Sequence, residues 1–398
     1  MTNSALPNQR WDIFCAVVDN YGDIGVTWRL AKQLTTEYSI HLTLWVDDLK
    51  SFSHILPELN PKLDSQVQHG VTINHWTEPL PTPFIPADVL IEAFACNLPA
   101  EVQHSMLECH KKHKSSLGAP AAPLWLNLEY LSAEDWVEGC HGLPSLQNSG
   151  LKKYFYFPGF GAKTGGLICE KDTLPNRMQW QADPSNRLKL FTQLGLSGIN
   201  LTDTVISVFS YESAALLSLC QLWAQSSTPV HALVPKGRSL NSLTSLIASP
   251  ISELQAGQQI GFGNLTIHIL PMTDQQGYDR LLWSCDINIV RGEDSFLRAQ
   301  WAARPFVWHI YPQEDDYHLV KLDAFMDCYG AEMSPELNQL WRGLNVAFNQ
   351  EQIAATQNEW QKLLLNRQAL LDHAQQWPIN ALIDEDLASR LVQFVKNS

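Results

Sequence analysis

Apolar runs alternate with helix-period segments along the first third of the chain. Runs of consecutive apolar residues are typical of buried strands, and apolar residues that recur every three or four positions are typical of helices. This pattern predicts strands over 12–18, 40–46, 71–76, 88–95 and 123–128, and helices over 26–34 and 100–113. Because parallel strands need crossover connections, the order indicates a doubly wound α/β sheet whose ligands bind at the carboxyl ends of its strands.

The same alternation restarts after a glycine-rich break. The segment YFYFPGFGAKTGGLICE, residues 154–170, holds one proline and four glycines, a composition typical of a turn-rich connection. Beyond it the pattern predicts strands over 204–209, 230–234, 265–270, 286–290 and 306–311, and helices over 213–224, 240–247, 278–283 and 295–302. The chain from 335 onward is helical in period and ends with a helix over 387–395.

These patterns predict a division into two Rossmann-like domains and a tail. The N-terminal domain is expected over 1–160 and the C-terminal domain over 161–375. A C-terminal helix within 376–398 is a candidate to pack back on the N-terminal domain. Two Rossmann-like domains that face each other across a cleft describe the GT-B glycosyltransferase architecture. Other enzymes and binding proteins share that architecture, so the fold alone does not choose the function.

Composition and charge narrow the class of protein. With 27 Lys+Arg against 41 Asp+Glu, the formal net charge is -14, so the chain is expected to repel nucleic acid and anionic membranes and to attract a cationic partner. Eight cysteines without a CxxC pair are typical of reduced, buried thiols. No stretch approaches the ~18 apolar residues of a membrane helix. We therefore expect a cytoplasmic protein whose 14 tryptophans form buried aromatic clusters.

The loop VVDNYGDIG, residues 17–25, lies where a nucleotide-binding protein often keeps a phosphate loop. A dinucleotide loop needs GxGxxG so that the backbone can approach a pyrophosphate, whereas here Asp19 and Asp23 would repel a phosphate. Two carboxylates in this place favour a proton or a cation. They could act as a general base, bind a guanidinium group or coordinate a metal ion. The alternative is that Asp23 is a helix N-cap and Asp19 a turn residue.

A second charged motif, RGEDS, follows a predicted strand of the second half. Asp294 or Ser295 is a candidate helix cap, and the free backbone N–H groups of that helix would meet a diphosphate. Glu293 would face the cleft. The alternative for Glu293 is a structural ion pair with Arg291 or Arg298.

Two further polar residues follow strands that end at the same predicted sheet edge. Tyr211 offers a stacking face for a nucleobase, and Gln275 offers the paired donor and acceptor that a pyrimidine edge needs. Either residue has packing or turn formation as an alternative role.

Four long strings of the sequence resemble one family. They are DNYGDIGVTWRLA, PLWLNLEYLSAE, KYFYFPGF with KTGGLI, and RGEDSFLRAQWAARPFVWHIYPQ with the following His318. In these strings the chain is similar to the elongation factor P arginine rhamnosyltransferases, over a span from about Trp11 to Leu322. Members of this family are inverting GT-B enzymes, which move rhamnose from dTDP-β-L-rhamnose to one arginine at a loop tip of elongation factor P.

The resemblance implies roles for particular residues. Asp23 would be the general base, Asp19 would support the acceptor site, and Glu293 would be the other essential acid. The donor-binding residues would be Asn20, Tyr211, Gln275, Arg291, Gly292, Asp294, Ser295 and Tyr311. The family often shows an aromatic residue and a proline where this chain has Met272 and Asp274, which leaves recognition of the thymine less defined than the catalytic residues.

No metal or other cofactor is expected. The acidic triplet at 384–386 is expected to begin the last helix and not to bind Mg²⁺. Two alternatives to the rhamnosyltransferase remain: another sugar-nucleotide enzyme of this fold, such as an epimerase or a transferase to a small acceptor, and a non-catalytic binding module. A nicotinamide oxidoreductase is disfavoured because the glycine fingerprint is missing.

Overall fold

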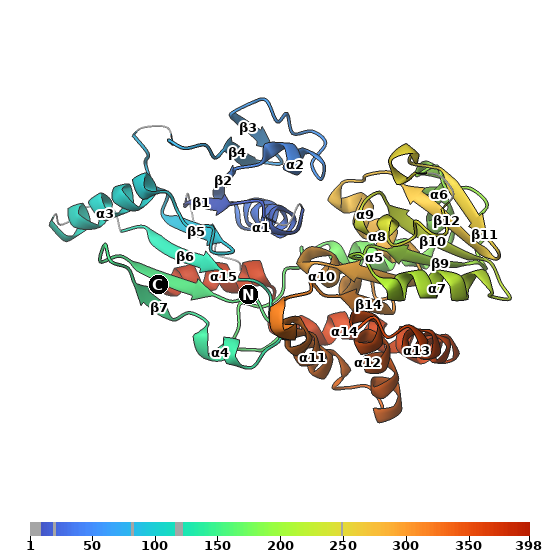
Figure 1. The fold of residues 1–398 in the computed structure, drawn as a ribbon. Coiled ribbons are helices and arrows are strands. Elements are labelled where there is room, and N and C mark those ends of the chain that lie inside the picture. The colour runs from blue at the N-terminus through green and yellow to red at the C-terminus, as the bar shows by residue number, and fades with distance from the viewer. Residues whose placement is uncertain (1–8, 19–20, 81–82, 116–121, 248–249) are drawn as a thin grey trace. The chain divides into compact units, whose positions relative to one another are not determined.

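The chain divides into two compact units. The computed structural model describes residues 9–18, 21–80, 83–115, 122–247 and 250–398. Unit 1 consists of Met1–Lys171 with Ala381–Ser398, and unit 2 consists of Asp172–Asn380 (Figure 1). The first division therefore falls later than the predicted 160/161, because the glycine-rich segment packs on unit 1. There the Cys169 carbonyl accepts from Gln33 Nε2 at 3.0 Å, and the backbone N–H of Lys171 donates to Glu37 Oε1 at 2.9 Å.

Unit 1 is built on one eight-stranded sheet in the order β3-β4-β2-β1-β5-β6-β8-β7. The two edge strands, β3 and β7, pair antiparallel to their neighbours, and the other pairs are parallel. The strands are β1 (Arg10–Cys15), β2 (His41–Val46), β3 (Ser65–Gln68), β4 (Val71–His75), β5 (Val89–Ala93), β6 (Leu124–Leu128), β7 (Pro144–Leu146) and β8 (Lys152–Tyr156). The helices are α1 (Gly22–Tyr38), α2 (Leu49–Ser53), α3 (Ala100–Ser115), α4 (Trp136–Cys140) and α15 (Leu387–Asn397).

Successive side chains of the central strands point to opposite faces of this sheet. Cys15 lies on the face covered by α1, where Thr27 Oγ1 donates to its Sγ at 3.5 Å. Phe14 therefore lies on the opposite face, in a cluster with Trp45, Trp125 and Met106 of α3. Both faces of the central strands are buried, which explains why these strands read as nearly continuous apolar runs.

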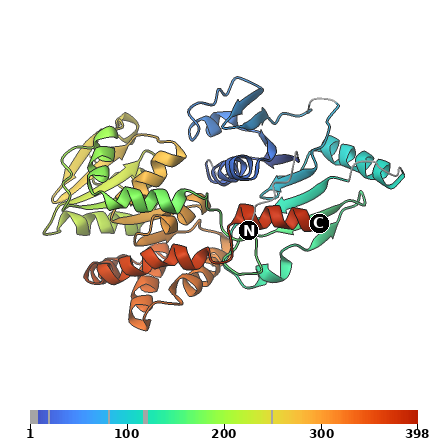
Figure 2. The same cartoon turned by 180° about the vertical axis from the view of Figure 1, so that it is seen from behind.

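The C-terminal helix α15 belongs to unit 1, and it packs on α1 and β8. Tyr38 and Ser389 are joined by a hydrogen bond of 2.6 Å between their hydroxyls. Phe394 makes edge contacts with Tyr154 and Tyr156 of β8, at 5.9 and 5.5 Å between ring centroids. Figure 2 shows α15 from behind, beside the strands of unit 1. The rest of the predicted tail, up to 380, belongs to unit 2.

Unit 2 is built on a six-stranded sheet in the order β11-β12-β10-β9-β13-β14, in which only β11 is antiparallel among the described strands. The strands are β9 (Thr204–Val208), β10 (Val230–Pro235), β11 (Gln259–Phe262), β12 (Leu265–Leu270), β13 (Ile287–Arg291) and β14 (Phe306–His309). The helices are α5 (Thr173–Ala182), α6 (Ser185–Gln193), α7 (Ala214–Ala224), α8 (Arg238–Asn241), α9 (Gln275–Ser284), α10 (Glu293–Trp301), α11 (Tyr317–Gly330), α12 (Pro335–Asn349), α13 (Ile353–Leu365) and α14 (Arg367–Ala381), with 3-10 turns η1 (Ile251–Glu253) and η2 (Glu314–Asp316).

Aromatic residues fill much of the interior of unit 2. Phe306 of β14 and Phe325 of α11 both contact Tyr329, at 5.2 and 5.5 Å between ring centroids. Trp341 of α12 joins this cluster, and its indole N–H donates to the Phe306 carbonyl at 3.0 Å. The expected clustering of buried tryptophans is thus present here. None of the described helices has the length and apolar character that a membrane span requires.

Some sequence predictions about elements were wrong. The predicted helix over 240–247 is observed only as the short α8, because the serine and threonine side chains of NSLTSL compete with helical backbone hydrogen bonds. The turn-rich segment from 154 begins inside strand β8. The strands β3, β7 and β11 were missed because edge strands are short and expose alternate residues, so they show no apolar run.

The start of α15 generates a stability prediction. Asp386 Oδ1 accepts from the backbone N–H groups of Ala388 and Ser389, at 2.8 and 3.1 Å, and from Gln33 Nε2 at 3.2 Å. Asp386→Ala is expected to lower the free energy of unfolding of unit 1 by ~1 kcal/mol or more, since a cap and a tether are both lost. The exposed Asp384 provides the matched control Asp384→Ala. Urea denaturation of both variants measures the difference, and equal midpoints would contradict the assignment.

Candidate functional site

Asp23 lies in the first turn of α1, just beyond the carboxyl end of β1. Its side chain is 4% exposed and is held at both oxygens. Oδ2 accepts from the backbone N–H of Val18 at 3.1 Å, and Oδ1 accepts from the Tyr130 hydroxyl at 3.2 Å. The residue before the helix is Tyr21, so the alternative in which Asp23 is the N-cap is wrong. Asp23 is instead a buried carboxylate with a fixed orientation.

Tyr130 and Phe94 are two aromatic residues at the same carboxyl edge of the sheet. Tyr130 follows β6 and Phe94 follows β5, and their rings stack at 4.5 Å with an interplanar angle of 19°. Phe94 is in the left-handed region at φ 54°, where a non-glycine residue is strained, and the next residue, Ala95, also has φ 54°. Ala95 is secured by its backbone N–H, which donates to Asn127 Oδ1 at 3.1 Å. The loop that presents the Phe94 ring to Tyr130 is thus tied to β6.

Sequence reasoning missed both of these aromatic residues. Both lie outside the residues that the sequence motifs single out, although Tyr130 belongs to the family string PLWLNLEYLSAE. The Glu129 carboxylate is half-buried and accepts a hydrogen bond from Asn127 Nδ2, and burial raises the pKa of this carboxyl. The available signal was the position of Tyr130, directly after a buried strand.

Part of the acidic loop lies outside the described residues. Asp19 and Asn20, both expected in the site, belong to that part, so their roles stay predictions. The next residue, Tyr21, is hydrogen-bonded to His54 Nδ1 through its hydroxyl at 3.0 Å. The backbone N–H of Gly25 donates to the Tyr21 carbonyl at 2.9 Å as the helix begins. The end of the loop is therefore joined to both α1 and α2.

In unit 2, Tyr211 lies beyond the carboxyl end of β9 and is only 3% exposed. The guanidinium of Arg291 lies over its ring at 4.7 Å from the centroid, and Tyr311 contacts the ring edge to face at 5.3 Å. This position is less open than a stacking platform for a nucleobase would be. The ring supports the guanidinium of Arg291, whose buried Nη1 has no hydrogen-bond partner among the residues that the structure describes. That donor remains available to an anion.

His309 was missed by sequence reasoning, and it packs against the same tyrosine. Its ring is 5.4 Å from Tyr211 and 5.1 Å from Phe348, edge to face in both contacts. Burial lowers the pKa of His309 to about 4, and the nearby charges of Arg291 and His318 add to that effect. A neutral imidazole therefore adjoins Arg291 and adds no positive charge to it.

The helix α10 begins at Glu293, directly after Arg291 and Gly292. Gly292 has φ 66° and ψ -173°, a conformation that essentially only glycine adopts, so a side chain here would be strained even though the space beside it is open. The predicted cap at Asp294 or Ser295 is wrong, because Gly292 is the capping residue and has no side chain to cap the helix. The first backbone N–H groups of α10 therefore lack a side-chain cap from that residue and point toward the strand edge.

Gln275 is the first residue of α9 and is buried. The residue before it, Asp274, caps this helix by accepting from the backbone N–H of Gly277 at 2.6 Å. The departure from the family at Asp274 is thus compatible with a well-formed helix start. Tyr278, one turn further, packs against Phe209 at 4.8 Å, which links α9 to the end of β9.

The expected site residues fall into two groups, each within its own unit. Asp23 is in unit 1. The group in unit 2 shares the carboxyl edge of the second sheet and includes Tyr211, Gln275, Arg291, Gly292, Glu293, Asp294, Ser295 and Tyr311. Within the described part of the chain, no group of three or more His, Cys, Asp or Glu residues is arranged to hold a metal ion.

A family model described as "Elongation-Factor P (EF-P) rhamnosyltransferase EarP" matches residues 11–396 of the chain. The chain belongs to this family. Its sequence is 63% identical to a protein-arginine rhamnosyltransferase of Shewanella oneidensis and 44% identical to one of Pseudomonas putida, with 98% of this chain covered in each case. The alignments cover 98% and 99% of those two relatives.

Solved structures agree with the family assignment. One, described as "Structural basis for EarP-mediated arginine glycosylation of translation elongation factor EF-P", is 30% identical, with a TM-score of 0.67 and coverage of 98% of this chain and 100% of that one. A UDP-GlcNAc 2-epimerase of Neisseria meningitidis, 9% identical over 98% of this chain and 100% of that one, has a TM-score of 0.51 and shares the fold alone. The predicted α/β GT-B architecture is confirmed, and the chain is an enzyme, a glycosyltransferase, as a member of the EarP family.

The environment of His309 generates a prediction about pH. Its folded pKa of about 4 lies below the ~6.5 of an unfolded histidine, so the unfolded state binds more protons below that value. The contribution of the neutral ring to stability is present above ~6.5 and is expected to be lost as the pH falls toward about 4. NMR of histidine-labelled protein, assigned with His309→Gln, is expected to show no titration of this ring near pH ~6.5. A midpoint there would contradict the assignment.

Proposed function

We propose that this enzyme transfers L-rhamnose from dTDP-β-L-rhamnose to the side chain of one arginine of translation elongation factor P, with inversion at the sugar carbon. The relatives named above are called protein-arginine rhamnosyltransferases, and the 30% identical structure is described as acting on EF-P. An acceptor that serves the ribosome would place the enzyme in the cytoplasm. The net charge of -14 is complementary to an arginine-bearing surface.

The single observation that carries the proposal is the position of Asp23. A buried carboxylate at a strand's carboxyl end suits a guanidinium, because a carboxylate accepts charge-assisted hydrogen bonds from guanidinium N–H groups. The hydrogen bonds from Val18 and Tyr130 restrict the carboxylate to one orientation. A fixed base at this sheet edge is what an arginine acceptor requires.

The proposed chemical step is a single in-line displacement. The side chain of arginine has a pKa above ~12, so a carboxylate does not deprotonate it beforehand. Asp23 would polarise the guanidinium while one of its nitrogens attacks the anomeric carbon, and would accept the proton as the new C–N bond forms. The bond between the sugar and the diphosphate breaks in the same step, and dTDP leaves with the electron pair. Because there is only one displacement, the configuration inverts.

The donor half of the proposal rests on unit 2. The departing diphosphate would be met by the backbone N–H groups at the start of α10 and by the buried donor of Arg291. Glu293, in the first turn of α10, would be the second essential acid, and Asp19 would support the acceptor. Asn20, Gln275, Asp294, Ser295 and Tyr311 would line the donor pocket. We propose that this anion site works without a metal ion.

Intact-mass measurement of elongation factor P tests the function directly. Incubation with the enzyme and dTDP-β-L-rhamnose is expected to add one deoxyhexose to the acceptor, and nothing to an acceptor whose target arginine is replaced by lysine. Consumption of the donor without any gain in acceptor mass would contradict the proposal and favour an epimerase or a transferase to a small acceptor. Addition of the sugar to the lysine variant would contradict the arginine assignment.

The two acidic residues generate a prediction about rate. Asp23→Asn and Glu293→Gln preserve shape but remove charge, and each is expected to lower kcat by ~100-fold or more, since a general base contributes about that much. The controls are Asp64→Asn, whose side chain is 99% exposed, and Glu336→Gln in the first turn of α12. Single-turnover kinetics of the folded variants provides the measurement. A near-normal rate in either test variant would remove that residue from the chemistry.

Tyr211 generates a prediction about donor affinity. Tyr211→Ala removes the ring that supports Arg291 and is expected to weaken dTDP binding by roughly 10-fold. The reason is that the variant loses a cation–π contact of ~0.5–2 kcal/mol together with the packing of the ring. Tyr211→Phe keeps the ring and is the matched control. Isothermal titration calorimetry with dTDP separates the two variants. Equal weakening by both would point to the hydroxyl and not to the ring.

A further inference from the structure

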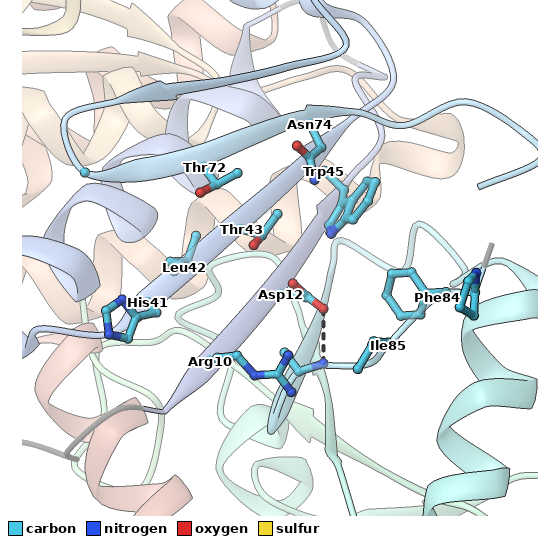
Figure 3. Close-up of a pocket in the computed structure, with 13 residues that line it drawn as sticks. Arg10, Asp12, His41, Leu42, Thr43, Trp45, Thr72, Asn74, Phe84 and Ile85 are labelled. Carbon is cyan, nitrogen blue, oxygen red and sulfur yellow. Dashed lines mark hydrogen bonds between the residues drawn. The ribbon is translucent and has the colours of Figure 1, made fainter. Parts of the chain in front are cut away.

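A pocket of about 390 Å³ lies in unit 1 apart from Asp23 (Figure 3). It is lined by residues of β1, β2 and β4 and by the segment 83–87 that leads to β5. Its strand residues Asp12 and Trp45 lie on the sheet face opposite α1, as Phe14 does. Asp23 begins α1 on the other face. The pocket is therefore separate from the proposed acceptor site.

The floor of the pocket is a row of polar residues across three adjacent strands. Asp12 of β1 is paired in register with Thr43 of β2, and Thr43 is paired with Thr72 of β4, so the three side chains share one face. Asp12 is 7% exposed, and its Oδ2 accepts from the backbone N–H of Ala87 at 3.3 Å. Polar residues are unusual on a buried face of a parallel sheet, which otherwise carries Val, Ile and Leu.

The carboxylate of Asp12 lies in an unusual environment for a charged group, because it is buried. Burial raises the pKa of its carboxyl to about 6, although hydrogen bonding by Ala87, Trp45 and Thr43 and the positive charge of Arg10 act in the opposite direction. The carboxylate is therefore mostly ionised at neutral pH. A carboxylate offers about four lone-pair sites, so it can accept a further donor beside the Ala87 N–H at 3.3 Å and the side chains of Trp45 and Thr43.

Two neighbouring buried groups have no well-formed hydrogen bond among the described residues, although the indole of Trp45 lies close enough to Asp12 to lower the pKa of that carboxyl. They are the indole N–H of Trp45 and the side-chain oxygen of Asn74, which lie in the next register row. Trp45 is 8% exposed, and stacking on Phe14 at 5.6 Å fixes its ring. Figure 3 shows the indole nitrogen directed toward Asp12 and Thr43. A buried polar group without a well-formed hydrogen bond is destabilising, so this donor and this acceptor in a single pocket favour a ligand that supplies both an acceptor and a donor.

The charges around the pocket select against ions. An anion would approach the Asp12 carboxylate, and a cation would approach Arg10, whose guanidinium Nη2 donates to the Pro86 carbonyl at 3.1 Å. A hydroxyl group is neutral and both donates and accepts. Several hydroxyls on one small frame would satisfy Asp12 and Asn74 as donors and the Trp45 N–H as acceptors. The Phe84 ring, 5.9 Å from Trp45, adds an apolar wall.

We propose that this pocket binds a neutral polyhydroxylated molecule of monosaccharide size, held by Asp12, Asn74, Trp45 and the two threonine hydroxyls. The volume lies near the lower end of the ~300–1,000 Å³ typical of small-molecule sites, which suits a single sugar ring. The proposal concerns unit 1 alone and does not depend on the identity of the donor or acceptor of the transfer reaction.

Saturation-transfer NMR and calorimetry of the full chain with L-rhamnose, D-glucose and myo-inositol test the proposal. At least one of these polyols is expected to bind saturably. Asp12→Asn and Thr72→Val are expected to weaken that binding by ~10-fold each, the loss that accompanies one good hydrogen bond. Thr36→Val, on the exposed side of α1, is the matched control and keeps wild-type binding.

Circular dichroism and urea denaturation of the full chain establish that each variant is folded. Saturable polyol binding that the two pocket variants weaken and the control does not would support the site. Absence of saturable binding by all three polyols would overturn it, as would equal binding by wild type and both pocket variants. Tetramethylammonium and acetate are included as charged probes, and stronger binding of either than of the polyols would also overturn the proposal.

Discussion

The hydrogen bonds that fix the Asp23 carboxylate are the interaction on which the candidate site of unit 1 depends. They join three separate elements of the sheet edge, because Val18 follows β1, Asp23 begins α1 and Tyr130 follows β6. The strained Phe94 loop after β5 is positioned by the stack with Tyr130. The environment of the Asp23 carboxylate thus depends on the carboxyl ends of three neighbouring strands lying side by side. The order β1-β5-β6 in the sheet supplies that register.

The two units use the same strand-to-helix turn with opposite electrostatics. In unit 1 the helix start carries a buried carboxylate held in one orientation, which suits a cationic group. In unit 2 the helix starts after a glycine that has no side chain to cap it, next to an arginine with a buried donor available. That arrangement suits an anion. A difference of a few residues at equivalent places in two related sheets therefore gives the two units opposite preferences for charge.

Elements with strong periodicity were predicted well from the sequence. The strand over 265–270 is observed with the same bounds as β12, because its residues form a continuous apolar run that is buried. The strand over 204–209 and the helix over 213–224 each differ from β9 and α7 by one residue. The edge strands β3 and β11 were missed because their residues are partly exposed and polar. The start of α10 was misplaced because backbone conformation at Gly292, and not side-chain capping, determines it.

The sequence by itself determined the α/β class and the family, because these depend on local periodicity and on short strings of neighbouring residues. Only the tertiary structure decided which distant groups meet. Tyr130 reaches Asp23 across 107 positions of the chain, and α15 returns to pack on α1 and β8 after the whole of unit 2. The register of β1, β2 and β4 likewise brings Asp12, Thr43 and Thr72 into one row. Contacts of this kind arise from strand order and packing, and local pattern contains no information about either.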